Sequence, residues 1–319
     1  MQENFKYLDD LIHSGAKEIV LTSDIVLDES EESEYLDGIN LDVYDLVIEA
    51  NGHMVDARGK TRIFYSTAKR VTIKNILLKN AVGAIYNLRG TLNILESTLS
   101  DNTAKVTGGA IYNDWGEINI RDSVLSYNAS DCHGGAIFSV NGAINIINSK
   151  LINNSAENDG GAIYNGGELN IKDSILSQNT ANGAGGAIYD NRGVININHS
   201  TLSGNASKGI FGGGAIHKNR SALNIIDSSL SHNTANADGG AIFSIDGELT
   251  ITKSDLSHNI SEGNGGAIYD WSLLTIADSE LCENTAKKDG GAVYAKNNQD
   301  LNLKDCIFKD NQSDNVFFS

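Results

Sequence analysis

Short alternations of apolar and polar residues recur along most of the chain. Residues 92–94 and 118–120, for example, read apolar, polar, apolar. A period of two over so few residues is typical of a β-strand rather than a helix. Helical spacing occurs before these stretches, at Phe5, Leu8, Leu11 and Ile12. Because Gly15 is a suitable helix stop, we predict one short amphipathic helix that covers the start of an all-β fold.

One short motif, Gly-Gly-Ala-Ile-Tyr or a close variant, occurs nine times in the sequence. Its alanines lie 25 to 28 residues apart, at Ala84, Ala110, Ala136, Ala162, Ala187, Ala215, Ala241, Ala267 and Ala292. A fixed period in this range predicts a solenoid, a propeller or another repeat array. No unit has room for a ten-residue helix, and a propeller blade needs about 40 residues. We therefore predict a parallel β-helix with about 26 residues and three short strands in each coil.

Polar residues of one kind also recur in fixed columns. An asparagine closes the third stretch of each unit, at Asn80, Asn102, Asn128, Asn154, Asn179, Asn205, Asn233, Asn259, Asn284 and Asn311. In stacked coils these side chains would lie about 4.8 Å apart and hydrogen-bond to one another as an asparagine ladder. A second column runs from Asn93 to Asn302 between apolar residues and should face solvent. A third column of serines starts at Ser97 and ends at Cys306.

The glycine pairs have an architectural explanation. A corner between strands needs a positive φ or a close backbone approach, and glycine provides both without a Cβ clash. One unit is 28 residues long because it carries an insertion at residues 207–212 (SKGIFG). We predict a bulging loop there.

An aromatic residue or histidine follows each Ala-Ile or Ala-Val step. These residues are Tyr86, Tyr112, Phe138, Tyr164, Tyr189, His217, Phe243, Tyr269 and Tyr294. Because the preceding position is always Ile or Val while this one accepts His, we expect the rings to point outward. Such a strip is suited to binding sugar rings or a protein partner. The alternative is that the rings only stabilise the sheet.

The chain divides into two regions within one continuous solenoid. Residues 1–80 are expected to form the cap helix and irregular first coils, and residues 81–319 the regular repeats. Residues 28–45 are strongly acidic and are expected to form a solvated loop. After Asn311 no cap is evident, so the C-terminal coil is open to end-to-end self-association.

The amino-acid composition is consistent with a β-helix and limits the classes of partner that the protein is expected to bind. The 319 residues include 33 glycines and no proline, and proline would remove backbone donors from strand ladders. The net charge of −17 argues against nucleic acid as a partner. Residues 1–60 hold 15 acidic residues against four basic ones.

We expect no membrane span, since no apolar run approaches about 18 residues, and the first 17 residues do not resemble a secretory signal. The cysteines Cys132, Cys282 and Cys306 should be free thiols.

Two motifs carry a family resemblance. Segments such as LSDNTAKVTGGAIY (99–112) and LCENTAKKDGGAVY (281–294) resemble the FxxNxA and GGAIY repeat of chlamydial polymorphic outer membrane proteins. This chain has Leu where that family has Phe, except at Phe308. Its first coils are similar to those of adhesin-like β-helix proteins of methanogenic archaea. The resemblance implies a right-handed, pectin-lyase-like β-helix that is adhesive and extracellular or displayed at the cell surface. Relatives usually carry an export signal and an anchor, and we find neither in this sequence, so a cytoplasmic protein or a fragment stays an alternative.

Many β-helices cleave polysaccharides, and glycoside hydrolysis needs two carboxylates about 5 to 10 Å apart. Three acid pairs share a column: Asp190 with Asp270 three coils apart, Asp122 with Asp173 skipping a coil, and Asp278 with Asp305 in adjacent coils. We interpret them as surface charges. His232 and His258 also occupy one column, and we interpret them as surface histidines rather than metal ligands. No catalytic residue, metal or cofactor is therefore predicted.

The sequence favours a non-catalytic, adhesin-like surface or scaffold protein that presents a repetitive β-helix face to a glycan or a protein. A carbohydrate-active enzyme of pectin-lyase-like fold, a lyase or a glycoside hydrolase, is the alternative.

Overall fold

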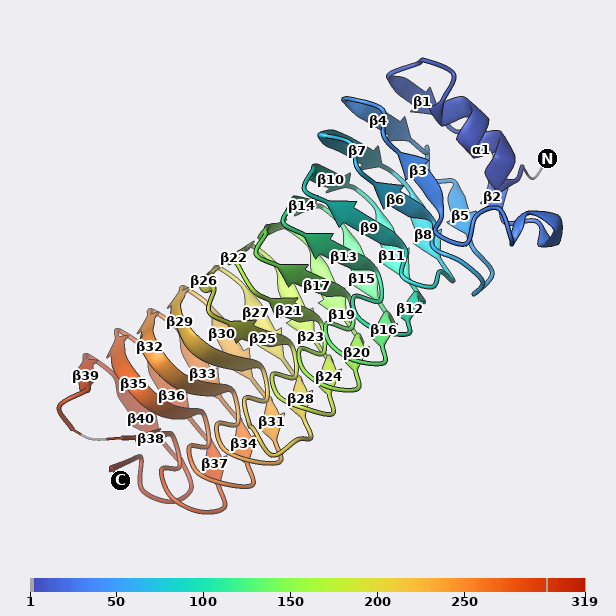
Figure 1. Ribbon diagram of the computed structural model, residues 1–319. Helices are drawn as coiled ribbons and strands as arrows, with labels where there is room; N and C mark the ends of the chain where they lie inside the picture. Colours follow the sequence, from blue (N-terminus) through green and yellow to red (C-terminus); the bar gives the residue numbers. More distant parts are fainter. Residues whose placement is uncertain (1–2, 297, 319) are drawn as a thin grey trace.

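The computed structural model describes residues 3–296 and 298–318. It is an elongated solenoid in which the chain advances coil by coil, and the two ends of the chain lie at its opposite ends (Figure 1). Neighbouring coils pair in parallel, for example through Ile111 and Ile137 or Leu125 and Leu151. The coils wind in the right-handed sense expected of parallel connections. The predicted parallel β-helix is confirmed.

The described residues form three sheets. The largest has 21 strands: β1 (Glu18–Val20), β3 (Ile39–Leu41), β4 (Leu46–Glu49), β6 (Phe64–Ser66), β7 (Arg70–Lys74), β9 (Ile85–Leu88), β10 (Thr91–Leu95), β13 (Ile111–Asp114), β14 (Glu117–Arg121), β17 (Ile137–Val140), β18 (Ala143–Ile147), β21 (Ile163–Asn165), β22 (Glu168–Lys172), β25 (Ile188–Asn191), β26 (Val194–Asn198), β29 (Ile216–Ile226), β32 (Ile242–Thr252), β35 (Ile268–Ala277), β38 (Val293–Ala295), β39 (Leu301–Lys304) and β41 (Val316–Phe318). The second has 12 strands: β2 (Ile25–Val26), β5 (Met54–Asp56), β8 (Leu77–Lys79), β11 (Thr98–Ser100), β15 (Val124–Ser126), β19 (Lys150–Ile152), β23 (Ile175–Ser177), β27 (Thr201–Ser203), β30 (Ser229–Ser231), β33 (Asp255–Ser257), β36 (Glu280–Cys282) and β40 (Ile307–Lys309). The third has eight strands: β12 (Thr103–Ala104), β16 (Ala129–Ser130), β20 (Ser155–Ala156), β24 (Thr180–Ala181), β28 (Ala206–Ser207), β31 (Thr234–Ala235), β34 (Ile260–Ser261) and β37 (Thr285–Ala286).

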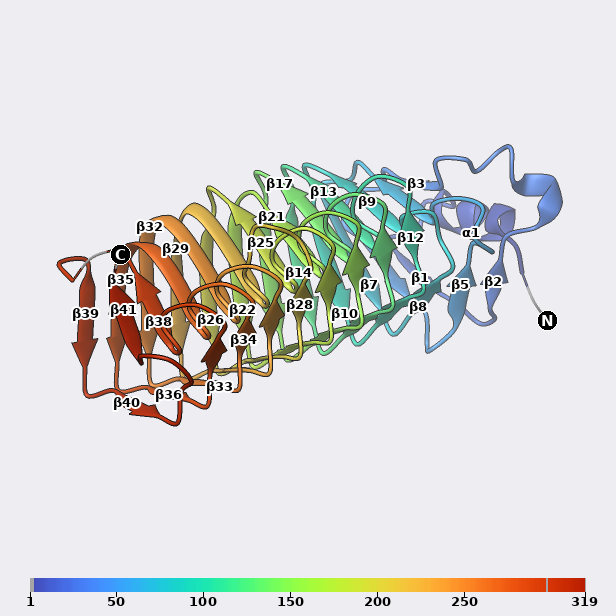
Figure 2. The same cartoon turned by 90° about the horizontal axis from the view of Figure 1, so that it is seen from below.

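The coils from β9 to β28 contain four short strands each, not the three we predicted, whereas the coils that begin at β29, β32 and β35 contain three because their first two strands are continuous. The third stretch of the repeat is divided by a corner, as between β15 and β16. There Tyr127 takes a left-handed conformation, with φ 55°, and Asn128 is buried. The pattern of apolar residues did not reveal this corner because the fourth strand is only two residues long. Figure 2 shows the resulting stack of similar coils from below.

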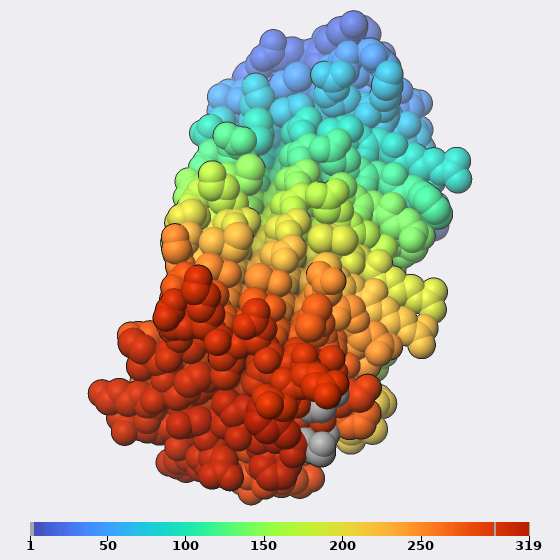
Figure 3. Space-filling view, turned by 90° about the vertical axis from the view of Figure 1, so that its left-hand side faces the viewer, coloured from blue at the N-terminus to red at the C-terminus, as the bar shows by residue number. Residues whose placement is uncertain are grey.

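The interior is filled by the apolar residues of the repeat. In one coil Ala110, Ile111, Ile118, Ile120 and Leu125 are all buried. Each buried Ile or Leu contributes about 1.5 to 3 kcal/mol relative to an exposed one. The same positions recur in each regular coil, so the core is one continuous apolar column along the solenoid. In Figure 3 successive coils appear as coloured bands between the two ends.

The glycine pairs serve both of the purposes we predicted. Gly134 has φ 64°, which lies in the left-handed region. A Cβ atom on Gly135 would lie 2.1 Å from the carbonyl oxygen of Gly161 in the next coil. The first glycine of each pair therefore provides the turn, and the second permits the close contact between coils.

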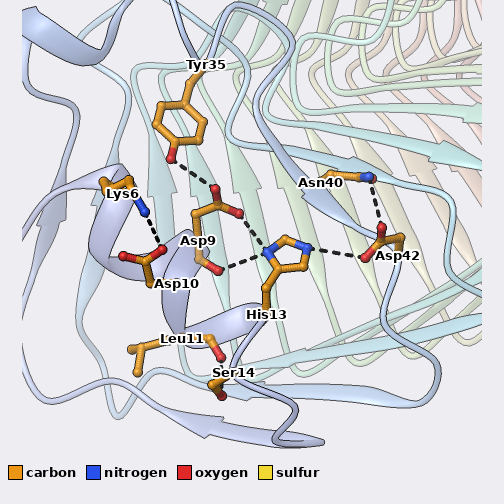
Figure 4. A network of polar contacts seen from close by, with 9 residues as sticks. All are labelled: Lys6, Asp9, Asp10, Leu11, His13, Ser14, Tyr35, Asn40 and Asp42. Atoms are coloured by element: carbon orange, nitrogen blue, oxygen red, sulfur yellow. Dashed lines mark hydrogen bonds and ion pairs between the residues drawn. The ribbon is translucent and has the colours of Figure 1, made fainter.

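The predicted cap helix is α1 (Phe5–Ile12), and it contacts β2 and β3 at the start of the solenoid. Phe5, Leu8 and Ile12 are fully buried. Polar contacts attach the exposed side of the helix to the first coils (Figure 4). The Asp9 carboxylate accepts from the Tyr35 hydroxyl at 3.0 Å and contacts the His13 ring at 2.8 Å.

The acidic segment 28–45 is not the solvated loop that we predicted. It contains a short 3-10 helix, η1 (Glu29–Glu31), and the strand β3. The buried Glu31 carboxylate accepts from the backbone N–H groups of Phe5 at 3.3 Å and Lys6 at 2.9 Å. Tyr35 packs edge-on against Phe5, with ring centroids 5.8 Å apart. Part of the acidic segment is therefore the support of the cap helix, because a carboxylate satisfies the free donors at a helix N-terminus.

The first coils differ from the later ones because they lack the fourth strand. The third sheet begins only at β12. At the other end, β41 adds a further strand beside β38, and Ile307 and Phe318 of the last coils are exposed.

Candidate binding surface

The first strand of each repeat places its ring on the outside of the solenoid. Ile111 of β13 is fully buried while the next residue, Tyr112, is half-buried. In the other repeats the Ile or Val is also buried and the ring is half-buried, except at His217 and Phe243, which are only 5% and 6% exposed. The isoleucines therefore point inward, as expected from the sequence. The nine predicted rings, here called the aromatic column, lie on one face of the 21-stranded sheet. They are Tyr86, Tyr112, Phe138, Tyr164, Tyr189, His217, Phe243, Tyr269 and Tyr294.

Neighbouring rings of the aromatic column stack on one another. Their centroids are 4.7 to 5.2 Å apart. Between Phe243 and Tyr269 the planes differ by only 2°. The ring faces therefore cover each other, and the column offers solvent mainly ring edges and tyrosine hydroxyls. Burial, together with Asp114, raises the pKa of Tyr86 to about 12, so its hydroxyl remains a proton donor at neutral pH.

Two further rings extend the aromatic column, and our sequence analysis missed both. Tyr65 of β6 stacks on Tyr86 at 5.1 Å, and Phe317 of β41 stacks on Tyr294 at 5.4 Å. Neither follows a Gly-Gly-Ala phrase. The available signal was the alternation Phe64–Ser66, which pairs in register with Ile85 and its neighbours.

The insertion at residues 207–212 covers part of the aromatic column. His217 is only 5% exposed, and its ring lies between Tyr189 and Phe243. Burial lowers the pKa of His217 to about 4, although Asp159 and the backbone of Phe211 and Gly212 oppose this shift. His217 is therefore neutral at pH 7. The loop itself leaves Ile210 and Phe211 exposed.

A second histidine borders the aromatic column. The His133 ring lies 5.0 Å from the ring of Tyr164, and its Nδ1 is 3.3 Å from the Asp159 carboxylate. Burial raises the pKa of Asp159, but the bonds from His133 and from the backbone N–H of Ala184 lower it more. A carboxylate therefore sits beside the rings on this side.

The asparagine ladder that we predicted is present and buried. Asn154 donates through Nδ2 to the Asn179 Oδ1 atom at 3.0 Å and to the Leu125 carbonyl at 3.0 Å. Its own Oδ1 accepts from the backbone N–H and the Nδ2 of Asn128, both at 3.0 Å. The same pattern links Asn102, Asn128, Asn154, Asn179, Asn205, Asn233, Asn259, Asn284 and Asn311. The ladder holds coils together and offers nothing to a ligand.

Asn80 does not belong to this ladder, contrary to our prediction. Its backbone is left-handed, and its side chain bonds to Asp56 at 3.1 Å. Ala81 takes the ladder position beneath Asn102. The asparagine column that begins at Asn93 lies on the half-buried outer face, where Asn119 donates to Asn93 at 3.0 Å. The serine column is buried, and the Ser97 N–H donates to the Ser123 hydroxyl at 3.1 Å.

The acid pairs weighed for catalysis do not form a surface site. Asp190 and Asp270 are buried and separated along their column by Lys218 and Ser244. Lys218 is also fully buried, and its ammonium donates to the Asp246 carbonyl at 2.6 Å. We did not predict this buried lysine, because the equivalent positions of neighbouring coils hold Asn, Asp or Ser.

The remaining candidates lie at exposed corners. Asp278 and Asp305 share a column in adjacent coils, both with φ 51°. His232 and His258 stack with centroids 4.7 Å apart. Among residues 3–296 and 298–318, no three His, Cys, Asp or Glu side chains lie together as a metal site would require. Cys132, Cys282 and Cys306 are free thiols, as predicted.

Five segments of the chain match the model of the Chlamydia polymorphic membrane protein repeat, at residues 96–114, 148–166, 173–191, 227–245 and 278–296. Each segment ends in the strand that carries a ring of the aromatic column. No curated protein and no solved structure matches the chain. The similarity to archaeal adhesin-like proteins therefore stays a prediction. No helix in the described part of the chain is long and apolar enough to cross a bilayer.

Proposed function

We propose that this protein is a non-catalytic, adhesin-like protein of the cell surface that binds a glycan or protein partner along the aromatic column. The observation that carries the proposal is the column itself, a continuous stack of rings on one face of the solenoid, half-buried except at the buried His217 and Phe243. Matches to a repeat of surface proteins support the same reading. Edges of aromatic rings and phenol hydroxyls together suit an amphipathic partner.

A glycan array followed by product analysis on acidic polysaccharides tests the proposal. We expect binding without cleavage, and we expect Tyr164→Ala combined with Tyr189→Ala to reduce it at least tenfold. The control is Tyr127→Ala, which removes a more exposed tyrosine ring, 60% exposed, from a corner outside the column. Tyr164→Phe combined with Tyr189→Phe keeps the stack and removes only the hydroxyls, so it separates ring edges from hydrogen bonding.

Two results would contradict the proposal. Binding that survives the double alanine variant would show that the aromatic column is not the site. Release of unsaturated or shortened oligosaccharides would show that the protein is an enzyme.

A further inference from the structure

A hollow of about 340 Å³ lies beside the first rings of the aromatic column. Its lining includes Arg62, Val82, Tyr86, Lys105, Val106 and Tyr112. Apolar side chains, ring edges and two cationic groups therefore face one space.

The hollow exists because one coil has a short connection. The chain passes from Ala81 to Ile85 in four steps, whereas the equivalent passage in the next coil, from Asn102 to Ile111, takes nine. The longer loop of the next coil supplies Lys105 and Val106 to the lining, and the preceding coil supplies Arg62.

The cationic groups of the hollow are poorly neutralised. The Arg62 guanidinium lies 5.4 Å from the centroid of the Tyr86 ring, in a cation–π arrangement. Among the described residues its nearest carboxylate is Asp37, at 4.0 Å and 95% exposed, which gives at most a weak ion pair. The Lys105 ammonium has no described carboxylate within 4.0 Å, and its side chain is exposed at the rim.

We propose that this hollow binds one carboxylate-bearing sugar residue, such as a hexuronic acid. The inference rests on the proposed glycan-binding function and names the ligand class for the N-terminal end of the aromatic column. A guanidinium pairs with a carboxylate through two parallel bonds, while apolar C–H groups of the sugar ring contact ring edges and Val106.

Ligand-observed NMR titration of the full chain tests the inference with three probes. Methyl β-D-glucuronide carries the carboxylate, methyl β-D-glucoside is the same ring without it, and N-acetylglycine is a single carboxylate without the ring. We expect the glucuronide to bind about tenfold more tightly than either of the others, as one charge-assisted contact would give.

Arg62→Gln should abolish this preference, and Lys105→Gln should reduce it about threefold. Arg192→Gln is the matched control, because it removes one positive charge at an exposed corner of a distant coil. Circular dichroism checks the fold, and if Arg62→Gln fails to fold, the exposed Lys105→Gln decides. Equal binding of both sugars, an unchanged preference in the Lys105 and Arg62 variants, or N-acetylglycine binding as tightly as the glucuronide would overturn the inference.

The outcome of this experiment can be distinguished from the outcome of the test of the proposed function. Array binding that depends on Tyr164 and Tyr189 without a glucuronide preference would reject the hollow and keep the column. A glucuronide preference that persists in the double alanine variant, with no other loss of array binding, would keep the hollow and reject the column.

Discussion

His217 shows how one residue of a repeat can depart from its column without breaking it. Its imidazole stacks between two aromatic neighbours as a phenyl ring would. Its environment differs from theirs because the insertion at residues 207–212 lies over it. A neutral imidazole is tolerated in such a place, but a charged one would lose its hydration.

We predict that His217 makes the protein less stable in acid. The pKa of His217 in the folded state, about 4, lies below the unfolded value of 6.5. The unfolded chain therefore takes up the proton first, and stability falls as the pH drops from about 6.5 through about 4. The full loss is about 3 kcal/mol at 1.36 kcal/mol per pKa unit. Urea unfolding of wild type and His217→Phe at pH 7, 5.5 and 4 measures this loss as a growing difference between the two proteins.

His232→Phe is the control, because His232 is exposed at a corner while also stacking on a neighbouring ring. Its unfolding should follow that of the wild type at every pH. A constant difference between His217→Phe and wild type across this range would show that the burial of His217 has no titration effect.

Between the third and fourth strands of each coil, the corner depends on one buried asparagine. The side chain of Asn154, which lies between β19 and β20, takes part in four hydrogen bonds. Alanine at this position would leave the Asn128 amide and the Leu125 carbonyl without partners inside the solenoid.

We predict that Asn154→Ala lowers the free energy of unfolding by roughly 2 to 4 kcal/mol, because buried polar groups lose their partners. Asn196→Ala is the matched control. Asn196 also bonds to asparagines above and below, at 2.9 Å, but on the half-buried outer face where water replaces them. We expect Asn196→Ala to lower the free energy of unfolding by less than about 1 kcal/mol. Denaturant unfolding of both variants makes the comparison, and equal losses would contradict a special role for the inner ladder.

Repetition made most strands and columns predictable, and it failed where the repeat is interrupted. The inward isoleucines and the asparagine ladder followed from spacing alone, because each residue stacks on its own copy. We wrongly assigned Asn80 to the asparagine ladder because its unit is shorter than the others, and we missed Tyr65 because no glycine pair precedes it. The support that Glu31 gives to α1 was hidden because it joins segments about 25 residues apart by a single carboxylate. The hollow beside Tyr86 arises from the same shortened unit.

At the scale of the whole molecule, each coil contacts chiefly its two neighbours. Stability in such a solenoid is a sum of local terms, so damage at one end need not reach the other. The N-terminal end is closed by α1, whose buried face covers the first coil and whose N-terminus is held by Glu31.

We therefore predict that Glu31→Ala opens the N-terminal coils and leaves the distant ones intact. The variant removes the acceptor of two N–H groups of α1 and exposes the apolar side chains beneath it. Hydrogen exchange followed by mass spectrometry should show at least tenfold faster exchange in residues 5–49 and unchanged exchange in residues 229–277. Glu32→Ala is the matched control, since Glu32 is the next residue and makes only a solvent-exposed ion pair with Lys60 at 3.6 Å. Faster exchange along the entire solenoid would mean that the coils unfold as one cooperative unit, and unchanged exchange in residues 5–49 would mean that Glu31 does not hold the cap.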